Sequence, residues 1–152
     1  MSGKLHPSHP SPLTAHGSPL ALQTFLGIDF GTSGARAIAI DDSGTILAEA
    51  RWNFSDQTAE AWRTALFDLI GQIPPEIRRL LGAIAINGTS STALLCDADN
   101  LPLCPPLLYS DTRAQAEAKQ LEQIAPSGHP VLSASSSLAK LLCFQKQPEL
   151  PR

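Results

Sequence analysis

LGIDFGTSGARAIAIDD, residues 26–42, contains two apolar runs separated by a short turn. The first run ends on a single carboxylate, Asp29, and FGTSG follows it at once. Short runs rich in Ile, Leu and Ala suit buried strands, whereas Gly, Thr and Ser favour a tight turn between them. The stretch therefore predicts a β-hairpin with one acidic side chain beside its turn.

The turn of this hairpin has the groups that an anion needs: Gly31, Thr32, Ser33 and Gly34. Glycine lets the main chain approach a ligand closely, and hydroxyls add hydrogen-bond donors. Asp29 could hold water on a Mg²⁺ ion that bridges phosphates. The stretch lacks the lysine of a P-loop and is not a GxGxxG sequence. Two interpretations stay open here: a phosphate-binding turn, or a tight turn that Asp29 caps.

Outward from the hairpin, the next segments predict a third strand and a helix. DDSG, residues 41–44, is a turn signal, and TILAEARWNF, residues 45–54, has the composition of a strand. Ser55 or Asp56 can cap the helix that follows. Apolar residues then recur at spacings of three and four until a Pro-Pro pair ends the pattern: Ala59, Trp62, Leu66, Leu69, Ile70 and Ile73.

GAIAIN, residues 82–87, is typical of a strand buried in a parallel sheet, and it opens into GTSST, residues 88–92. A hairpin around residues 97–100 and a helix over about 112–124 follow. A last helix is expected in residues 136–147, with Leu138, Leu141, Leu142 and Phe144 inward. The order of elements predicts a mixed α/β sheet whose first three strands are antiparallel, as in RNase H-like and actin-like domains.

Composition limits the class of protein. At 152 residues, with 43% hydrophobic and 16% charged residues, the chain resembles one globular domain, which we assign to residues 24–152. Residues 1–23 are rich in Pro, Ser and His, so we expect a disordered extension. The net charge of -3 and the lack of a long apolar run argue against nucleic acid and membrane as partners. Three cysteines without a CxxC pair suit a cytoplasmic protein.

Four segments taken in order, GIDFGTSGARA, IAINGTSSTALLCD, PPLLYSDTRA and SSLAKLLCF, resemble the amino-terminal part of the FGGY family of carbohydrate kinases. The pentulose kinases related to xylulokinase and ribulokinase are the most similar group. The resemblance implies an RNase H-like domain of the actin-like ATPase superfamily and ATP with Mg²⁺ as cofactors. It also implies transfer of the γ-phosphoryl group to a sugar hydroxyl. Asp29 then takes the Mg²⁺ role and the turn at residues 31–34 the phosphate role.

The resemblance also implies residues on the sugar side. Many family members carry GQxHG after the fourth strand, where this chain has hydroxyl side chains: Thr89, Ser90 and Ser91. The YSDTR segment is similar to the family's WxDxR, so Asp111 and Arg113 are expected to line or brace the sugar pocket. The alternative for this pair is an ion pair that stabilises the start of a helix.

The family comparison further implies what lies elsewhere. Its general base is an aspartate after a fifth strand, and a second domain holds the adenosine, so both are expected beyond Arg152. We therefore expect an incomplete domain that is inactive alone and that pairs with the remainder of a kinase. The alternative is a non-catalytic fragment that binds sugar or a partner chain. A nuclease of the RNase H type would need a second carboxylate where Asn87 lies.

Overall fold

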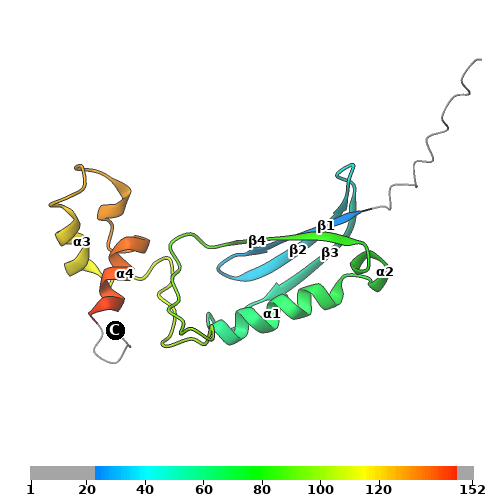
Figure 1. The fold of residues 1–152 in the computed structure, drawn as a ribbon, viewed down its shortest axis with the longest axis horizontal. Helices are drawn as coiled ribbons and strands as arrows, with labels where there is room; N and C mark the ends of the chain where they lie inside the picture. Colours follow the sequence, from blue (N-terminus) through cyan, green and yellow to red (C-terminus); the bar gives the residue numbers. More distant parts are fainter. Residues whose placement is uncertain (1–22, 147–152) are drawn as a thin grey trace, which may run out of the picture.

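The computed structural model describes residues 23–146, which form a four-stranded sheet, a long helix packed on it, and a smaller helical unit (Figure 1). The strands lie in the order β3-β2-β1-β4. Their bounds are Thr24–Phe30 for β1, Gly34–Asp41 for β2, Ile46–Asn53 for β3 and Leu81–Gly88 for β4. β1, β2 and β3 are antiparallel and β4 runs parallel to β1, which confirms the predicted mixed sheet. The predicted extension falls outside the described residues, apart from Gln23.

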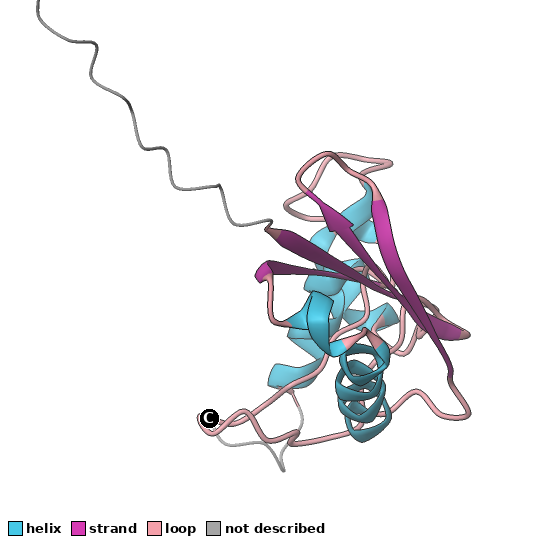
Figure 2. Cartoon of the chain, turned by 90° about the vertical axis from the view of Figure 1, so that its right-hand side faces the viewer, coloured by secondary structure: helices cyan, strands magenta, loops and turns pink. Residues whose placement is uncertain are grey.

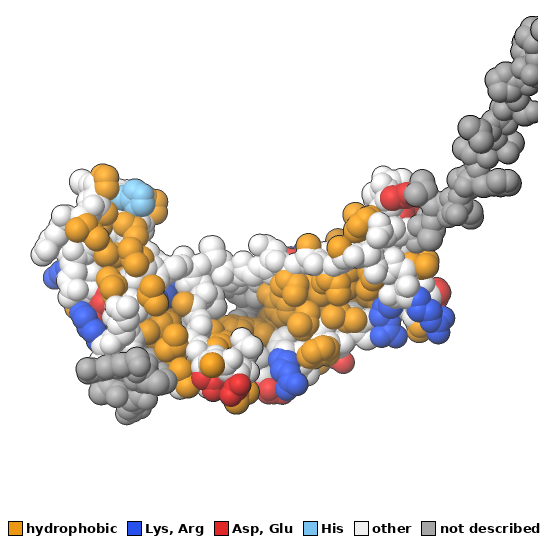
Figure 3. All heavy atoms as spheres, in the orientation of Figure 1, with side chains coloured by type: hydrophobic (Ala, Val, Ile, Leu, Met, Phe, Trp, Pro, Cys, Tyr) orange, Lys and Arg blue, Asp and Glu red, His pale blue; other side chains and the backbone are white. Residues whose placement is uncertain are grey.

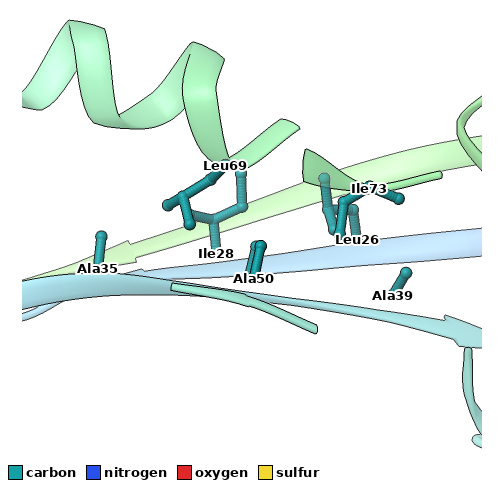
Figure 4. Close-up of a cluster of buried hydrophobic side chains, with 8 residues drawn as sticks. Leu26, Ile28, Ala35, Ala39, Ala50, Leu69 and Ile73 are labelled. Atoms are coloured by element: carbon teal, nitrogen blue, oxygen red, sulfur yellow. The ribbon is translucent and has the colours of Figure 1, made fainter. Parts of the chain in front are cut away.

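The core of the sheet follows from the alternation in the hairpin sequence. Leu26 and Ile28 of β1 are buried on one face, where Ala39 and Ala37 of β2 are their partners in register. Successive side chains of a strand point to opposite faces, so the residues between them face away from this core. The small alanines of β2 and β3 leave room for a helix to pack closely. Figure 4 shows Leu69 and Ile73 reaching from that helix toward Leu26 and Ile28.

The long helix α1, Ala59–Gln72, lies along this face of the sheet (Figure 2). Its N-cap is Thr58, whose hydroxyl accepts a hydrogen bond from the Ala61 backbone N–H at 3.1 Å. The predicted cap at Ser55 or Asp56 is therefore wrong, because the segment leaving β3 continues for a few residues before it becomes helical. After Pro74, the short helix α2, Pro75–Arg78, makes the single turn that leads into β4.

β4 was expected to be buried, and this expectation is wrong although its parallel pairing is right. Ile84 and Ile86 are 47% and 59% exposed. The helix α1 packs mainly on β2 and β3, and β4 is the edge strand of the described sheet. Figure 3 shows hydrophobic side chains gathered on this side of the molecule.

The segment after β4 folds back on itself as predicted, but its two arms are joined by isolated β-bridges and do not form regular strands. Ala93 pairs with Leu107 and Cys96 with Pro102, around a turn in which Asp97 Oδ1 accepts from the Leu101 backbone N–H at 2.8 Å. Proline has no N–H to donate, so a continuous ladder cannot form through a strand that contains several prolines. The two arms are therefore in contact without being regular strands.

The last part of the described chain is a small helical unit with its own core. Its elements are α3, Gln115–Leu121, the 3₁₀ helix η1, Pro130–Leu132, and α4, Ser137–Gln145. The core consists of four residues: Ala114, Ala118, Leu121 and Ala139. The helix α3 is shorter than the predicted 112–124. No helix within residues 23–146 has the length and apolar character needed to cross a membrane.

The inward face of α4 differs from its prediction. Phe144 is buried as expected, whereas Leu138 and Leu141 are 39% and 49% exposed. Lys140, which an apolar pattern would place outward, is completely buried. Leu142, also expected inward, is partly buried and packs against the small core, so the prediction is right for Leu142 and Phe144 and wrong for Leu138 and Leu141. The buried lysine ammonium donates to backbone carbonyl groups on neighbouring loops.

The contact between α3 and α4 includes an ion pair that should make this unit sensitive to acid. Lys146 Nζ lies 2.8 Å from Glu117 Oε1, and the Glu117 side chain is only 8% exposed. The hydrogen bond from Lys146 holds the pKa of Glu117 below its ordinary value. A carboxyl group with a lower pKa in the folded protein than in the unfolded chain stabilises the fold at pH values above its unfolded-state pKa. This stabilisation is lost as the pH falls through its folded-state pKa.

We therefore expect the helical unit to lose stability as the pH is lowered below the ordinary pKa of a glutamate, about 4.3. Lys146→Ala should flatten this dependence, because the carboxyl then loses the strongest interaction that favours its charged form. Lys119→Ala, at an exposed position of α3, should keep the wild-type slope. Urea titrations followed by far-UV circular dichroism at several pH values measure the effect. Equal slopes in Lys146→Ala and the wild type would contradict the prediction.

Candidate functional site

The site begins where two neighbouring parallel strands end. Asp29 of β1 and Asn87 of β4 are partners in register, and Asn87 Nδ2 donates to Asp29 Oδ1 at 2.8 Å. Both side chains belong to exposed residues. Ligands of open α/β sheets commonly bind outside the carboxyl ends of the strands. Sequence reasoning did not include Asn87 in the site, although it ends an apolar run just as Asp29 does.

The turn after Asp29 is anchored by its main chain. The Gly31 N–H donates to the Gly34 carbonyl at 2.9 Å, which closes the turn. The Thr32 carbonyl accepts from Gln57 Nε2 at 2.7 Å, and the Ser33 carbonyl accepts from the Phe54 N–H at 3.0 Å. These bonds fix the turn to the segment before α1. Thr32 and Ser33 remain exposed at its tip, so their hydroxyls are accessible to a ligand.

Two hollows flank the paired strand ends. One, of about 560 Å³, is lined by Asp29, Asn87 and Arg36 together with apolar residues of the sheet. Arg36 is the cross-strand partner of Asp29 in β2, so the guanidinium and the carboxylate lie on the same face. The pairing could have been read from the sequence: in a hairpin with a two-residue turn at Thr32 and Ser33, Asp29 lies opposite Arg36, seven residues later. Sequence reasoning missed Arg36 because the exact register was not assigned.

The second hollow, of about 430 Å³, lies between β4 and α1. Trp62, Leu66 and Ile86 give it apolar walls. Its polar groups come from Gln57, Asn87, Thr89 and Thr92, among others. A largely apolar hollow with a few convergent polar groups is the usual form of a small-molecule site.

The loop after β4 is close to the hairpin turn. Thr89 Oγ1 donates to the Phe30 carbonyl at 3.2 Å, and the Thr92 N–H donates back to the Thr89 carbonyl at 3.4 Å. Ser91 has a φ of 61°, a left-handed conformation that few serines adopt. Ser90 is exposed. The structure thus places Thr89 next to the predicted phosphate turn, with Ser90 and Ser91 immediately beyond it.

Asp111 and Arg113 form a two-point ion pair just before α3. Arg113 Nε donates to Asp111 Oδ1 at 3.0 Å, and an Arg113 terminal nitrogen lies 2.7 Å from Asp111 Oδ2. The hydrogen bond from Arg113 lowers the pKa of Asp111, and the same bond raises the pKa of Arg113. Among the described residues, no hydrogen bond joins this pair to Asp29 or to its turn. Contact of the pair with a sugar stays a prediction.

Comparison with known proteins identifies this arrangement. The family model for the amino-terminal domain of the FGGY family of carbohydrate kinases matches residues 24–139. The chain belongs to this family. The xylulose kinase of Lactococcus lactis is 27% identical over 146 residues, which cover 82% of this chain and 28% of the relative.

Solved structures agree with the FGGY assignment. A "xyloylose kinase" from Brucella ovis superposes with a TM-score of 0.73 at 25% identity, over 82% of this chain and 30% of that one. The xylulose kinase from Rhodospirillum rubrum, at 21% identity, has the same fold with a TM-score of 0.64, over 83% of this chain and 30% of that one. This FGGY chain thus spans less than a third of the length of the relatives it matches.

The FGGY site offers few ligands for a metal. Within residues 23–146, no group of three or more His, Cys, Asp or Glu side chains is placed to hold an ion. Mg²⁺ often keeps several water molecules and binds proteins through one or two carboxylates plus substrate phosphates. A single exposed carboxylate beside a donor-rich turn, as at Asp29, fits that mode of binding and not a closed protein cage.

Proposed function

We propose that this chain is the amino-terminal part of an ATP-dependent carbohydrate kinase that acts on a pentulose. The observation that carries the proposal is the Asp29 and Asn87 pair at the ends of β1 and β4, between the turn at residues 31–34 and the loop at residues 88–92. The proposed reaction transfers the γ-phosphoryl group of ATP to a sugar hydroxyl. The similarity to xylulose kinases supports a ketopentose as the substrate class.

On the phosphate side, the chain's own groups bind and orient. The backbone of Gly31 and Gly34 lets phosphate oxygens approach, while Thr32 and Ser33 donate hydroxyl hydrogen bonds. Arg36, across the strand from Asp29, offers a positive charge to the same phosphates. Asp29 would hold a Mg²⁺ ion through water, and Asn87 orients that carboxylate by its hydrogen bond. When bound, Mg²⁺ neutralises the phosphate charge that develops during transfer.

On the sugar side, the proposal assigns the hydroxyls of Thr89, Ser90 and Ser91 to hydrogen bonds with hydroxyl groups of the substrate. The hollow of about 430 Å³ beside this loop is large enough for a small ligand. Asp111 and Arg113 brace the neighbouring segment through their ion pair. The loop at residues 88–92 and the Asp111 and Arg113 pair belong to different parts of the fold. A sugar can contact both only if each is held in a fixed position.

The remaining steps fall to the rest of the proposed kinase. Phosphoryl transfer to a hydroxyl needs a carboxylate that accepts the hydroxyl proton. In the proposal Asp29 is already used for Mg²⁺, and Asp111 is neutralised by Arg113. The proton acceptor and the adenosine site therefore belong outside residues 23–146, and the remainder of the kinase is the proposed partner. The proposed setting is the cytoplasm, without nucleic acid or membrane as partners.

Nuclear magnetic resonance titrations of the 152-residue chain test the two halves of the proposal separately. We expect MgATP to shift the amide signals of residues 31–34, and D-xylulose or D-ribulose to shift those of residues 88–92, at ligand concentrations of about 1 mM or above. Asp29→Ala should remove the Mg²⁺ dependence of the first set only. The chain alone should release no sugar-dependent ADP.

The outcomes distinguish the candidates. No response to either ligand would contradict the proposed function. A response to sugar without any response to MgATP would favour the alternative of a sugar-binding fragment without a catalytic role. Sugar-dependent ADP release that disappears in Asp29→Ala would contradict the assignment of the proton acceptor to another part of the kinase.

A further inference from the structure

Lys140 of α4 is a buried lysine that the proposed reaction does not use. Its residue is fully buried, and its Nζ donates to the Ser91 carbonyl at 2.5 Å and to the Leu108 carbonyl at 2.7 Å. Lysine is almost never fully buried without partners, because its ammonium group is strongly hydrated in water. These contacts join three segments that are far apart in the sequence.

The partners of Lys140 are backbone carbonyls. No ion pair among the described residues includes it. Burial lowers the pKa of Lys140, and the charge of nearby Asp111 opposes that effect. Hydrogen bonds to two carbonyl oxygens stabilise the ammonium charge and at the same time hold the two loops to which these carbonyls belong. The arrangement therefore suits a role in positioning.

The first loop is the one that follows β4. The Ser91 carbonyl and the Thr92 N–H are the two ends of one peptide group, and each has a partner: Lys140 Nζ on the oxygen, and the Thr89 carbonyl on the N–H at 3.4 Å. Ser91 has the left-handed φ of 61°. Such a conformation persists in serine only where its surroundings fix it. Lys140 supplies that constraint from the side of the helical unit.

The second loop leads into the Asp111 and Arg113 pair. The Leu108 carbonyl accepts from Lys140 Nζ and also from the Asp111 N–H at 2.9 Å. One ammonium group thus contacts both segments to which the proposed function assigns the sugar. Thr89 connects the first of them to the hairpin turn through Phe30.

We propose that Lys140 is the positioning residue that aligns the loop at residues 88–92 with the segment at residues 108–113, so that both face one sugar. This inference rests on the proposed function for the identity of the ligand. The ordering of the two loops by the Lys140 ammonium group does not depend on which ligand binds.

The first test uses Lys140→Met, which keeps the length and apolar stem of the side chain and removes its charge and donors. Amide hydrogen exchange at Thr92 and Asp111 should accelerate by about tenfold or more, because both amides lie in turns that Lys140 holds. Amides of β1 and β2 should be unchanged. Lys119→Met, at an exposed site of α3, is the matched control and should change neither set.

A second measurement needs no variant to fold. In wild-type protein, the Lys140 ammonium should give a slowly exchanging ¹⁵N signal with couplings across its hydrogen bonds to the two carbonyls. Lack of any protected lysine ammonium would overturn the inference. So would a Lys140→Met protein whose Thr92 and Asp111 amides exchange as in the wild type.

Sugar binding supplies the functional measurement. In Lys140→Met, shifts at residues 88–92 should need about tenfold more pentulose, while the response of residues 31–34 to MgATP stays the same. Unchanged pentulose binding in a variant with loosened loops would overturn the role in sugar positioning. If wild-type protein gives no pentulose shifts, the proposed function fails, whereas the loop-ordering role is judged by amide exchange alone.

Discussion

Leu69→Ala is expected to reduce the free energy of unfolding of the sheet and α1 by about 2–5 kcal/mol. Leu69 is fully buried and packs against Leu26, Ile28 and the alanines of β2 and β3. Removing its isobutyl group takes away apolar contacts and leaves a cavity that rigid strands cannot fill. Urea titration followed by tryptophan fluorescence measures the change, because Trp52 and Trp62 both lie in this part of the fold.

Phe67 of the same helix is the matched control. It is 61% exposed, and Arg63 lies over its ring with the guanidinium carbon 6.0 Å from the ring centre. Phe67→Ala should therefore cost less than about 1 kcal/mol. Leu69→Met, which nearly conserves volume, should cost less than about 1.5 kcal/mol and provides a folded variant if the alanine form is too unstable. Equal losses in Leu69→Ala and Phe67→Ala would contradict the packing shown here.

Gly34→Ala should destabilise the hairpin by at least about 1–3 kcal/mol, because the added methyl group overpacks a backbone contact. A Cβ at Gly34 would overlap the backbone carbonyl oxygen of Trp52 and lie 3.4 Å from the Cα of Asn53. Both atoms belong to the main chain of β3, so neither can rotate away. The strands must separate at the point where the turn closes. Urea titration by tryptophan fluorescence measures this loss as well.

The same substitution at Gly71 should have the opposite sign. Gly71 is inside α1, and an added Cβ there meets nothing within 4 Å. Alanine in a helix is more favourable than glycine by about 0.5–1 kcal/mol, so Gly71→Ala should be neutral or stabilising. If both variants lose stability equally, the steric explanation for Gly34 is wrong.

The sheet could be predicted because its signals are local. Leu26 and Ile28 alternate with residues of the other face, and the turn at residues 31–34 contains the amino acids that a tight connection needs. The polar ends of β1 and β4 were visible in the sequence as Asp29 and Asn87. Their contact follows only from the parallel pairing of two strands that are far apart in the chain.

The features that were predicted wrongly depend on contacts between residues far apart in the sequence. The helix α1 is capped by Thr58 and not by Ser55 or Asp56, and the intervening Gln57 donates to the Thr32 carbonyl of the hairpin turn, a contact that no local pattern shows. Residues of α4 were predicted inward by their apolar character, yet Lys140 is buried, where two carbonyls far along the chain accept hydrogen bonds from its ammonium group. Ile84 and Ile86 look like buried strand residues, yet they are exposed because β4 lies at the edge of the described sheet, which a local pattern does not reveal.

The described chain has two hydrophobic clusters that share no residue, one between the sheet and α1 and one in the helical unit. Separate cores can unfold separately, each with its own cooperativity. Both tryptophans belong to β3 and α1, which form the first core, so tryptophan fluorescence does not report the unfolding of the second core. An unfolding curve from tryptophan fluorescence therefore reports the stability of the first core alone. The coupling between the two cores is measured by how far a substitution in one core shifts the unfolding transition of the other.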